Sequence, residues 1–142
     1  MSRSGPIILV EDDEEDQILL SEVLRSLNIK NELKCFADGI YALDFLRTTT
    51  EKPFLILCDV NMPRMNGFQL RRTINAEEYL RKKSIPFIFL TTSASREEVN
   101  QAYDLTVQGF FKKATRFDDY VAIIKLITQY WHNCNHPNND AT

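Results

Sequence analysis

The sequence lacks the features that mark membrane and secreted proteins. No apolar run reaches about 18 residues, so no transmembrane helix is predicted. The N-terminus has no basic stretch followed by an apolar one, so no secretory signal is predicted. The net charge is −3, which gives no general attraction to nucleic acid or to anionic membranes. We therefore expect a cytoplasmic protein with neither nucleic acid nor a membrane as its partner.

Cysteine is scarce as well. The three cysteines, Cys35, Cys58 and Cys134, are odd in number and far apart, which fits free thiols in a reducing compartment better than a disulfide framework. His132 and His136 lie on either side of Cys134, but a zinc site needs four ligands in a fixed geometry. We expect no metal site in this polar segment.

What the chain does contain is a regular alternation of short apolar runs and helical patterns. Its 142 residues, 44% hydrophobic and 26% charged, predict a single globular domain. Five strands alternating with five helices predict a parallel sheet that is covered by helices on both faces. We place the domain at residues 5–131 and a polar C-terminal tail at residues 132–142. The predicted strands are Pro6–Val10, Leu33–Phe36, Phe54–Cys58, Phe87–Leu90 and Gly109–Phe111.

Polar residues follow four of these strands. Glu11 and Asp12 follow the first strand, Asp59 the third, Thr91 the fourth and Lys113 the fifth. Because the carboxyl ends of parallel strands lie at one edge of the sheet, we expect these residues to lie close together there.

Three carboxylates at one edge repel each other unless a cation joins them. Mg²⁺ is typically held by one or two carboxylates, water and phosphate oxygens. A carboxylate, a metal ion, a lysine and a hydroxyl together can surround a phosphoryl group during in-line transfer. An aspartate can itself be the acceptor in such a transfer, and we assign this role to Asp59. We interpret Asp13 to Asp16 as a solvated helix start that suits the helix dipole.

The same residues carry a family resemblance. The acidic pair Glu11-Asp12, the segment from Asp59 through Met62-Pro63 to Gly67, and the later Thr91 and Lys113 stand in the order typical of one family. From about Pro6 to Tyr130 the chain resembles the receiver domain of two-component response regulators, of the single-domain chemotaxis-type and phytochrome-linked kind. The resemblance implies a flavodoxin-like (βα)5 three-layer sandwich with strand order 2-1-3-4-5.

The resemblance also implies a role for each residue of the site. Asp59 would take a phosphoryl group from a histidine kinase or phosphotransfer protein. Asp12 and Asp59 would bind Mg²⁺ directly together with the backbone carbonyl of Asn61, and Glu11 would help through water. Lys113 would pair with the acyl phosphate. Asn61, with Ser93, also lies where family members tune the phosphate lifetime.

Two further residues would convert phosphorylation into a change of surface. Thr91 would hydrogen-bond the phosphoryl oxygen, and Phe110 would match the aromatic switch residue of the family. Their inward movement would reshape the fourth helix, the fifth strand and the fifth helix, where a downstream protein or a second copy of the chain would bind. Phe110 has no hydroxyl, so its readout must come from packing. Ala114 stands where the family has a proline that carries a cis peptide bond.

Three other functions remain as alternatives. A phosphohydrolase with an aspartate nucleophile needs a second acid two residues on, where this chain has Asn61. A flavodoxin-like electron carrier needs a phosphate-binding loop after the first strand, where acids stand instead. A receiver that works by binding alone, without phosphorylation, is disfavoured by the intact acids and Lys113. We therefore expect a signalling protein that catalyses at most its own phosphotransfer and slow autodephosphorylation.

Overall fold

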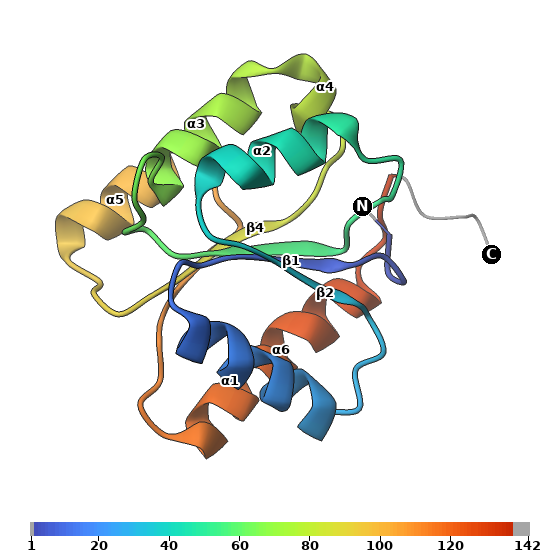
Figure 1. The fold of residues 1–142 in the computed structure, drawn as a ribbon, viewed down its shortest axis with the longest axis vertical. Helices are drawn as coiled ribbons and strands as arrows, with labels where there is room; N and C mark the ends of the chain where they lie inside the picture. The colour runs from blue at the N-terminus through green and yellow to red at the C-terminus, as the bar shows by residue number, and fades with distance from the viewer. Residues whose placement is uncertain (1, 138–142) are drawn as a thin grey trace.

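Five short strands form one parallel sheet in the order β2-β1-β3-β4-β5 (Figure 1). The fold is known from a computed structural model, which describes residues 2–137. The predicted fold class and strand order are confirmed. The strands are β1 (Ile7–Val10), β2 (Leu33–Phe36), β3 (Leu55–Cys58), β4 (Phe87–Thr91) and β5 (Gly109–Lys112).

Helices cover both faces of this sheet. Helices α1 and α6 lie on one face, and α2, α3, α4 and α5 lie on the other (Figure 1). Within residues 2–137, no helix combines the length and the apolar character that a membrane crossing requires. The helices are α1 (Glu14–Ser26), α2 (Gly39–Thr48), α3 (Gly67–Ala76), α4 (Glu78–Arg81), α5 (Arg96–Asp104) and α6 (Phe117–Asn133).

Side chains on each strand alternate between two cores, as the pleat of a strand requires. On β3, Ile56 and Cys58 face the core under α2 and α3, whereas Leu55 and Leu57 face the core under α1 and α6. All four side chains are at most 2% exposed. A strand buried on both faces explains why the sequence shows an unbroken apolar run there.

The expectation of five helices was wrong by one. The charged segment after α3 contains the short helix α4, which places Leu80 in the core while its other residues are exposed. Four residues are too few to show a helical period in sequence. The helix counted fourth in the sequence is therefore α5, and the one counted fifth is α6.

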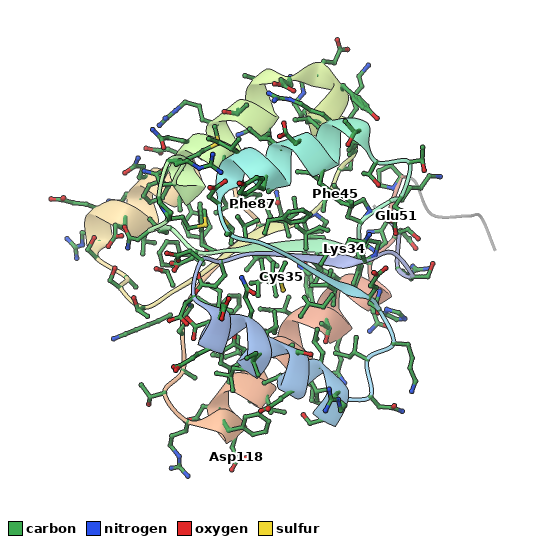
Figure 2. The ribbon with its side chains drawn as sticks, viewed as in Figure 1. Lys34, Cys35, Phe45, Glu51, Phe87 and Asp118 are labelled. Atoms are coloured by element: carbon green, nitrogen blue, oxygen red, sulfur yellow. The ribbon has the colours of Figure 1, made fainter. Side chains whose placement is uncertain are left out.

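The outer strand β2 is protected by charge. Lys34 lies on this edge strand, pairs with Glu51 at 2.9 Å and lies 5.1 Å from the centre of the Phe45 ring (Figure 2). A lysine on an edge strand opposes pairing with a strand of another molecule. Lys34 therefore makes β2 an unfavourable edge for the addition of a further strand.

Gly67 allows the chain to turn back beside the end of β3. Its N–H donates to the carbonyl of Val60 at 2.9 Å. A Cβ at this position would stand 2.4 Å from the carbonyl oxygen of Asp59 and 2.6 Å from Cε1 of Phe89. No side chain fits between a backbone carbonyl and a buried ring, so this close approach requires glycine.

We predict that Gly67→Ala lowers the free energy of unfolding by about 1–3 kcal/mol, because the methyl group overpacks against backbone. Gly109→Ala is the matched control, since its Cβ would come no closer than 3.3 Å to the end of the Phe111 ring. The control should cost less than about 1 kcal/mol, because alanine also reduces the entropy of the unfolded chain. Urea denaturation measures both, and equal costs would contradict the steric argument.

Candidate functional site

The backbone of the sheet places Glu11 and Asp59 side by side. The N–H of Asp59 donates to the carbonyl of Val10 at 3.0 Å, and the N–H of Glu11 donates to that of Phe36 at 2.9 Å. Each acid is thus the first residue after its strand, at the carboxyl edge of the sheet. Open α/β folds bind ligands at this edge.

Glu11, Asp12 and Asp59 form a group of carboxylates with ligand oxygens within 4.8 Å of one another. Among residues 2–137 this is the only group of histidine, cysteine and acidic side chains arranged to hold a metal ion. Glu11 is 2% exposed and Asp59 8% exposed, whereas Asp12 faces solvent. One oxygen of Glu11, Oε2, is buried without a hydrogen-bond partner. An orphaned carboxylate oxygen beside two further acids fits a hard divalent cation.

Lys113 lies among these acids, with a side chain only 10% exposed. Its Nζ donates to Oε1 of Glu11 at 2.6 Å and to Oδ2 of Asp16 at 2.7 Å. Oδ2 of Asp59 lies 3.6 Å from the same nitrogen. One ammonium group therefore faces several carboxylates and leaves the site with excess negative charge.

Asp16 was missed at the sequence level. Its interpretation as part of a solvated helix start was wrong, because it is half-buried and bonds Lys113. The sequence feature that could have assigned Asp16 to the site is its position in the first turn of a helix that begins at this edge of the sheet. Asp13, by contrast, is the helix cap, and its side chain accepts from the N–H of Glu15 at 2.9 Å.

The electrostatics of the site follow from burial. Burial raises the pKa of Glu11 to about 9, the neighbouring carboxyl group of Asp16 adds to this shift, and Lys113 opposes it. Burial alone would lower the pKa of Lys113, but its hydrogen bonds to Asp16 and Glu11 raise it instead. Lys113 is therefore a permanent cation at neutral pH.

Thr91 and Phe110 lie next to this group, on β4 and β5. Thr91 is fully buried, and its Oγ1 has no hydrogen-bond partner. Its carbonyl accepts from the N–H of Lys113 at 2.7 Å, which fixes the chain at the start of the lysine loop. The Phe110 ring is half-buried and lies 5.8 Å from the Phe89 ring. No cis peptide bond occurs in residues 2–137, so the Lys113–Ala114 bond is trans.

The loop after Asp59 carries Asn61, which is exposed. Nε of Arg64 donates to Oδ2 of Asp38 at 2.7 Å, and the guanidinium lies 4.7 Å from the centre of the Tyr41 ring. Asp38 also caps α2 by accepting from the N–H of Ile40. This tie between the loop and α2 was not found from the sequence, because the two residues are 26 positions apart.

The polar C-terminal segment carries no metal group in its described part. The ring Nε2 of His136 lies 2.7 Å from the carbonyl of Trp131 and forms a hydrogen bond with it. Helix α6 ends at Asn133, two residues past residue 131, where we placed the end of the domain. Residues 138–142 lie outside the described part of the chain.

The fold is that of a receiver domain. The sequence profile of the response regulator receiver domain family matches residues 7–125, and the chain belongs to this family. Members act in two-component signalling.

Two response regulators are among the relatives. The chain is 34% identical to response regulator Rcp1 of Synechocystis sp. over 130 residues. The aligned region covers 88% of this chain and 87% of the relative. The solved structure of the phosphorylated cyanobacterial phytochrome response regulator RcpA superposes with a TM-score of 0.84 and 28% identity, over 95% of this chain and 99% of that one.

Metal-bound receivers are also similar. The Mn²⁺-bound form of Rcp1 has a TM-score of 0.79 and 29% identity, over 94% and 97% of the two chains. The receiver domain of the sensor histidine kinase PA1611 from Pseudomonas aeruginosa, solved with a magnesium ion in its active-site cleft, has a TM-score of 0.73 and 27% identity, over 92% and 98% of the two chains.

We predict that Lys113→Met lowers the free energy of unfolding by about 3 kcal/mol in EDTA, because it leaves buried acids without their cation. Lys112→Met is the matched control, since the neighbouring lysine is exposed. The control should change stability by no more than about 0.5 kcal/mol. Urea denaturation of both variants gives the comparison, and a Lys113→Met protein as stable as the control would disprove the role of the ammonium group.

Proposed function

We propose that this protein is a phosphorylation-controlled response regulator in which Asp59 accepts a phosphoryl group from a histidine kinase or a phosphotransfer protein. One arrangement carries the proposal. Asp59 stands at the sheet edge with one oxygen, Oδ1, accepting from the N–H of Val60, while Oδ2 lies 3.6 Å from Lys113. An oxygen that is near a cation and not held in a strong pair is suited to attack phosphorus.

The carboxylates would hold the Mg²⁺ ion that such a transfer requires. Asp12 and Asp59 would bind it directly with the backbone carbonyl of Asn61, and Glu11 would bind through water. The orphaned oxygen of Glu11 and the excess negative charge of the site support this assignment. The Mn²⁺-bound and Mg²⁺-bound relatives are consistent with it. When bound, the ion neutralises charge that builds up on the phosphoryl oxygens.

The protein's own groups then have separate tasks. A carboxylate oxygen of Asp59 forms the new bond to phosphorus, and the bond from phosphorus to the donor nitrogen breaks with its electron pair left on that nitrogen. Lys113 supplies a fixed positive charge to the acyl phosphate. The Thr91 hydroxyl, which has no partner in this structure, donates to a phosphoryl oxygen.

The output would follow from the same residues. Movement of Thr91 toward the phosphoryl group opens space that Phe110 can fill, and this changes the surface formed by α5, β5 and α6. Exposed Tyr103 and half-buried Trp131 belong to this surface. A downstream protein, or a second copy of the chain in a homodimer, would bind there. The proposed site of action is the cytoplasm.

The rival function is a receiver that binds partners without being phosphorylated. The two differ in one measurable property, the covalent modification of Asp59. Lys113 and the three metal-type carboxylates are intact, which favours phosphorylation. Turnover of an external phosphate ester is disfavoured, because Asn61 cannot serve as the second acid.

We predict that incubation with Mg²⁺ and acetyl phosphate adds one phosphoryl group, seen by intact-mass measurement. The Asp59→Asn variant should show no such adduct, because its amide oxygen is a poor nucleophile. Asp44→Asn is the control, since this exposed acid lies on α2 and should leave the adduct unchanged. An adduct that persists in Asp59→Asn would show that the phosphoacceptor has been assigned to the wrong residue.

We predict that Asp12→Ala weakens Mg²⁺ binding by about tenfold or more, because the site loses a charged ligand. Isothermal titration calorimetry is the suitable measurement. Glu14→Ala is the matched control, because Glu14 is an exposed acid outside the carboxylate group. Equal affinities for the two variants would remove Asp12 from the metal site.

A further inference from the structure

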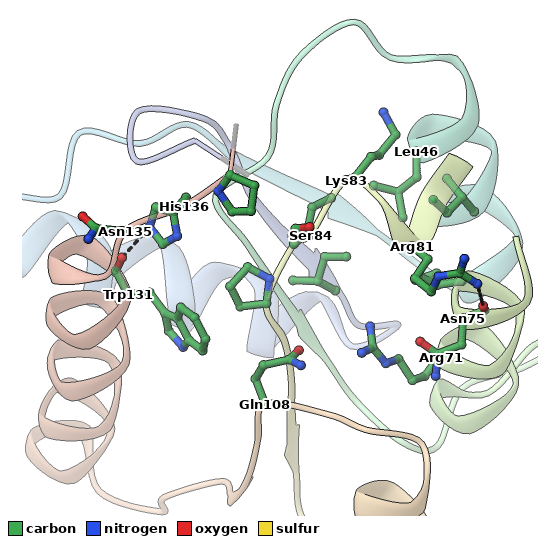
Figure 3. Close-up of a pocket in the computed structure, with 16 residues that line it drawn as sticks. Leu46, Arg71, Asn75, Arg81, Lys83, Ser84, Gln108, Trp131, Asn135 and His136 are labelled. Atoms are coloured by element: carbon green, nitrogen blue, oxygen red, sulfur yellow. Dashed lines mark hydrogen bonds between the residues drawn. The ribbon is translucent and has the colours of Figure 1, made fainter. Parts of the chain in front are cut away.

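A cavity lies at the amino-terminal edge of the sheet, opposite to the edge that carries Asp59. It has a volume of about 330 Å³ and opens between α3, the segment before β4, and the end of α6 (Figure 3). It is therefore separated from Asp59 by the length of the strands. The lining includes the aliphatic residues Leu46, Ile56, Ile74, Leu80 and Ile85.

The charge of this cavity is opposite to that of the protein. The chain has 20 acidic residues against 17 lysines and arginines, yet within residues 2–137 the cavity lining includes Arg71, Arg81 and Lys83 and no acid. Lys83 also lies over the ring of Tyr79, at 4.5 Å. A concentration of one sign of charge in a concave site attracts ligands of the other sign.

Arg71 is the most unusual of these cations. It is 8% exposed, and its Nε and Nη2 donate to the carbonyls of Leu105 and Thr106 at 3.1 and 2.9 Å. No carboxylate in residues 2–137 pairs with it. Burial lowers its pKa to about 10, which still leaves it charged at neutral pH. A buried arginine without an acidic partner is rare, because desolvated charges are normally paired.

The guanidinium of Arg71 points toward the cavity in Figure 3, on the same side as Arg81. Nη1 of Arg81 donates to the carbonyl of Asn75 at 3.3 Å, and the side chain is otherwise exposed. Two arginines on one wall can bind the oxygens of a phosphate or carboxylate by charge-assisted hydrogen bonds.

The opposite wall is aromatic. The half-buried ring of Trp131 lies there with His136, whose ring is stacked at 6.4 Å between centroids and 27° between planes (Figure 3). Nε2 of His136 is held by the carbonyl of Trp131. A flat aromatic surface of this kind favours a planar ring by stacking.

We propose that this cavity binds a small planar aromatic anion, of the class of the purine nucleoside monophosphates, with its ring against Trp131 and its anionic group on Arg71 and Arg81. The volume lies at the lower end of the range of small-molecule pockets, about 300–1,000 Å³, and suits a mononucleotide. The site does not depend on Asp59 or on a metal ion. Because Arg71 also donates to the carbonyls of Leu105 and Thr106, which directly follow α5, the ligand would share a contact residue with the proposed output surface.

The test is a titration of the full chain with AMP, and separately with GMP, in EDTA. Trp131 is the sole tryptophan, so its fluorescence reports occupancy directly, and isothermal titration calorimetry gives the affinity. We expect saturable binding of at least one nucleotide, with quenching of Trp131. Adenosine, which lacks the anion, and inorganic phosphate, which lacks the ring, should each bind about tenfold more weakly or worse, because each loses a charge-assisted contact or a stacking contact.

Variants separate the pocket from other sites. Arg81→Gln, at an exposed position that does not threaten folding, should weaken nucleotide binding by about tenfold. Arg72→Gln is the matched control, because Arg72 is an exposed arginine on α3, next to Arg71, and does not line the cavity. Asp59→Asn should bind as the unmodified chain does, so this result is independent of the phosphoacceptor assignment. Absence of saturable binding, equal binding of adenosine or phosphate, or full affinity in Arg81→Gln would each overturn the proposal.

Discussion

The contact of Lys113 with the acids at the carboxyl edge of the sheet is the constraint on which this structure depends. Four carboxylates, from Glu11, Asp12, Asp16 and Asp59, meet there, and Lys113 is the cation set among them. Such a cluster is unfavourable in isolation, because like charges in a partly buried site repel. It persists because the strands fix the backbone at that edge. The fold therefore stabilises a charge arrangement that the side chains alone would not maintain.

The sequence was sufficient for the parts of this arrangement that topology controls. The run ending at Asp59 and the acids after the first strand predict the sheet and its edge, because parallel strands align their carboxyl ends. The sequence was insufficient for contacts between side chains that lie far apart along the chain. No local sequence pattern predicts the contact of Lys113 with Asp16, 97 positions away, or that of Arg64 with Asp38, 26 positions away. Helix α4 was not predicted because its single turn is too short to show a helical period of apolar residues.

The two edges of the sheet have opposite electrostatic character. One edge holds acids around Lys113, and the other holds arginines around a cavity whose lining, in the described part of the chain, includes no acid. Both edges border α5 and β5. Thr91 and Phe110 lie near the acidic edge of the sheet. At the other edge, Arg71 donates to the carbonyls of Leu105 and Thr106, which follow the last turn of α5. Under the two proposals, the surface formed by α5, β5 and α6 would respond both to phosphorylation at one edge and to a ligand at the other.

Two buried polar groups indicate where the energy for switching would come from. Oε2 of Glu11 and Oγ1 of Thr91 have no hydrogen-bond partner in this structure. An unsatisfied buried group costs about 1–3 kcal/mol, so the pair costs about 2–6 kcal/mol. Reversing a two-state equilibrium from 1:99 to 99:1 takes about 5.5 kcal/mol. Under the proposed function, a cation would satisfy Glu11 already before modification, whereas the Thr91 hydroxyl would gain a phosphoryl oxygen as partner only in the modified protein and would recover about 1–3 kcal/mol there. The ground state would then be held under a polar penalty that phosphorylation relieves, and this differential interaction is what shifts a conformational equilibrium.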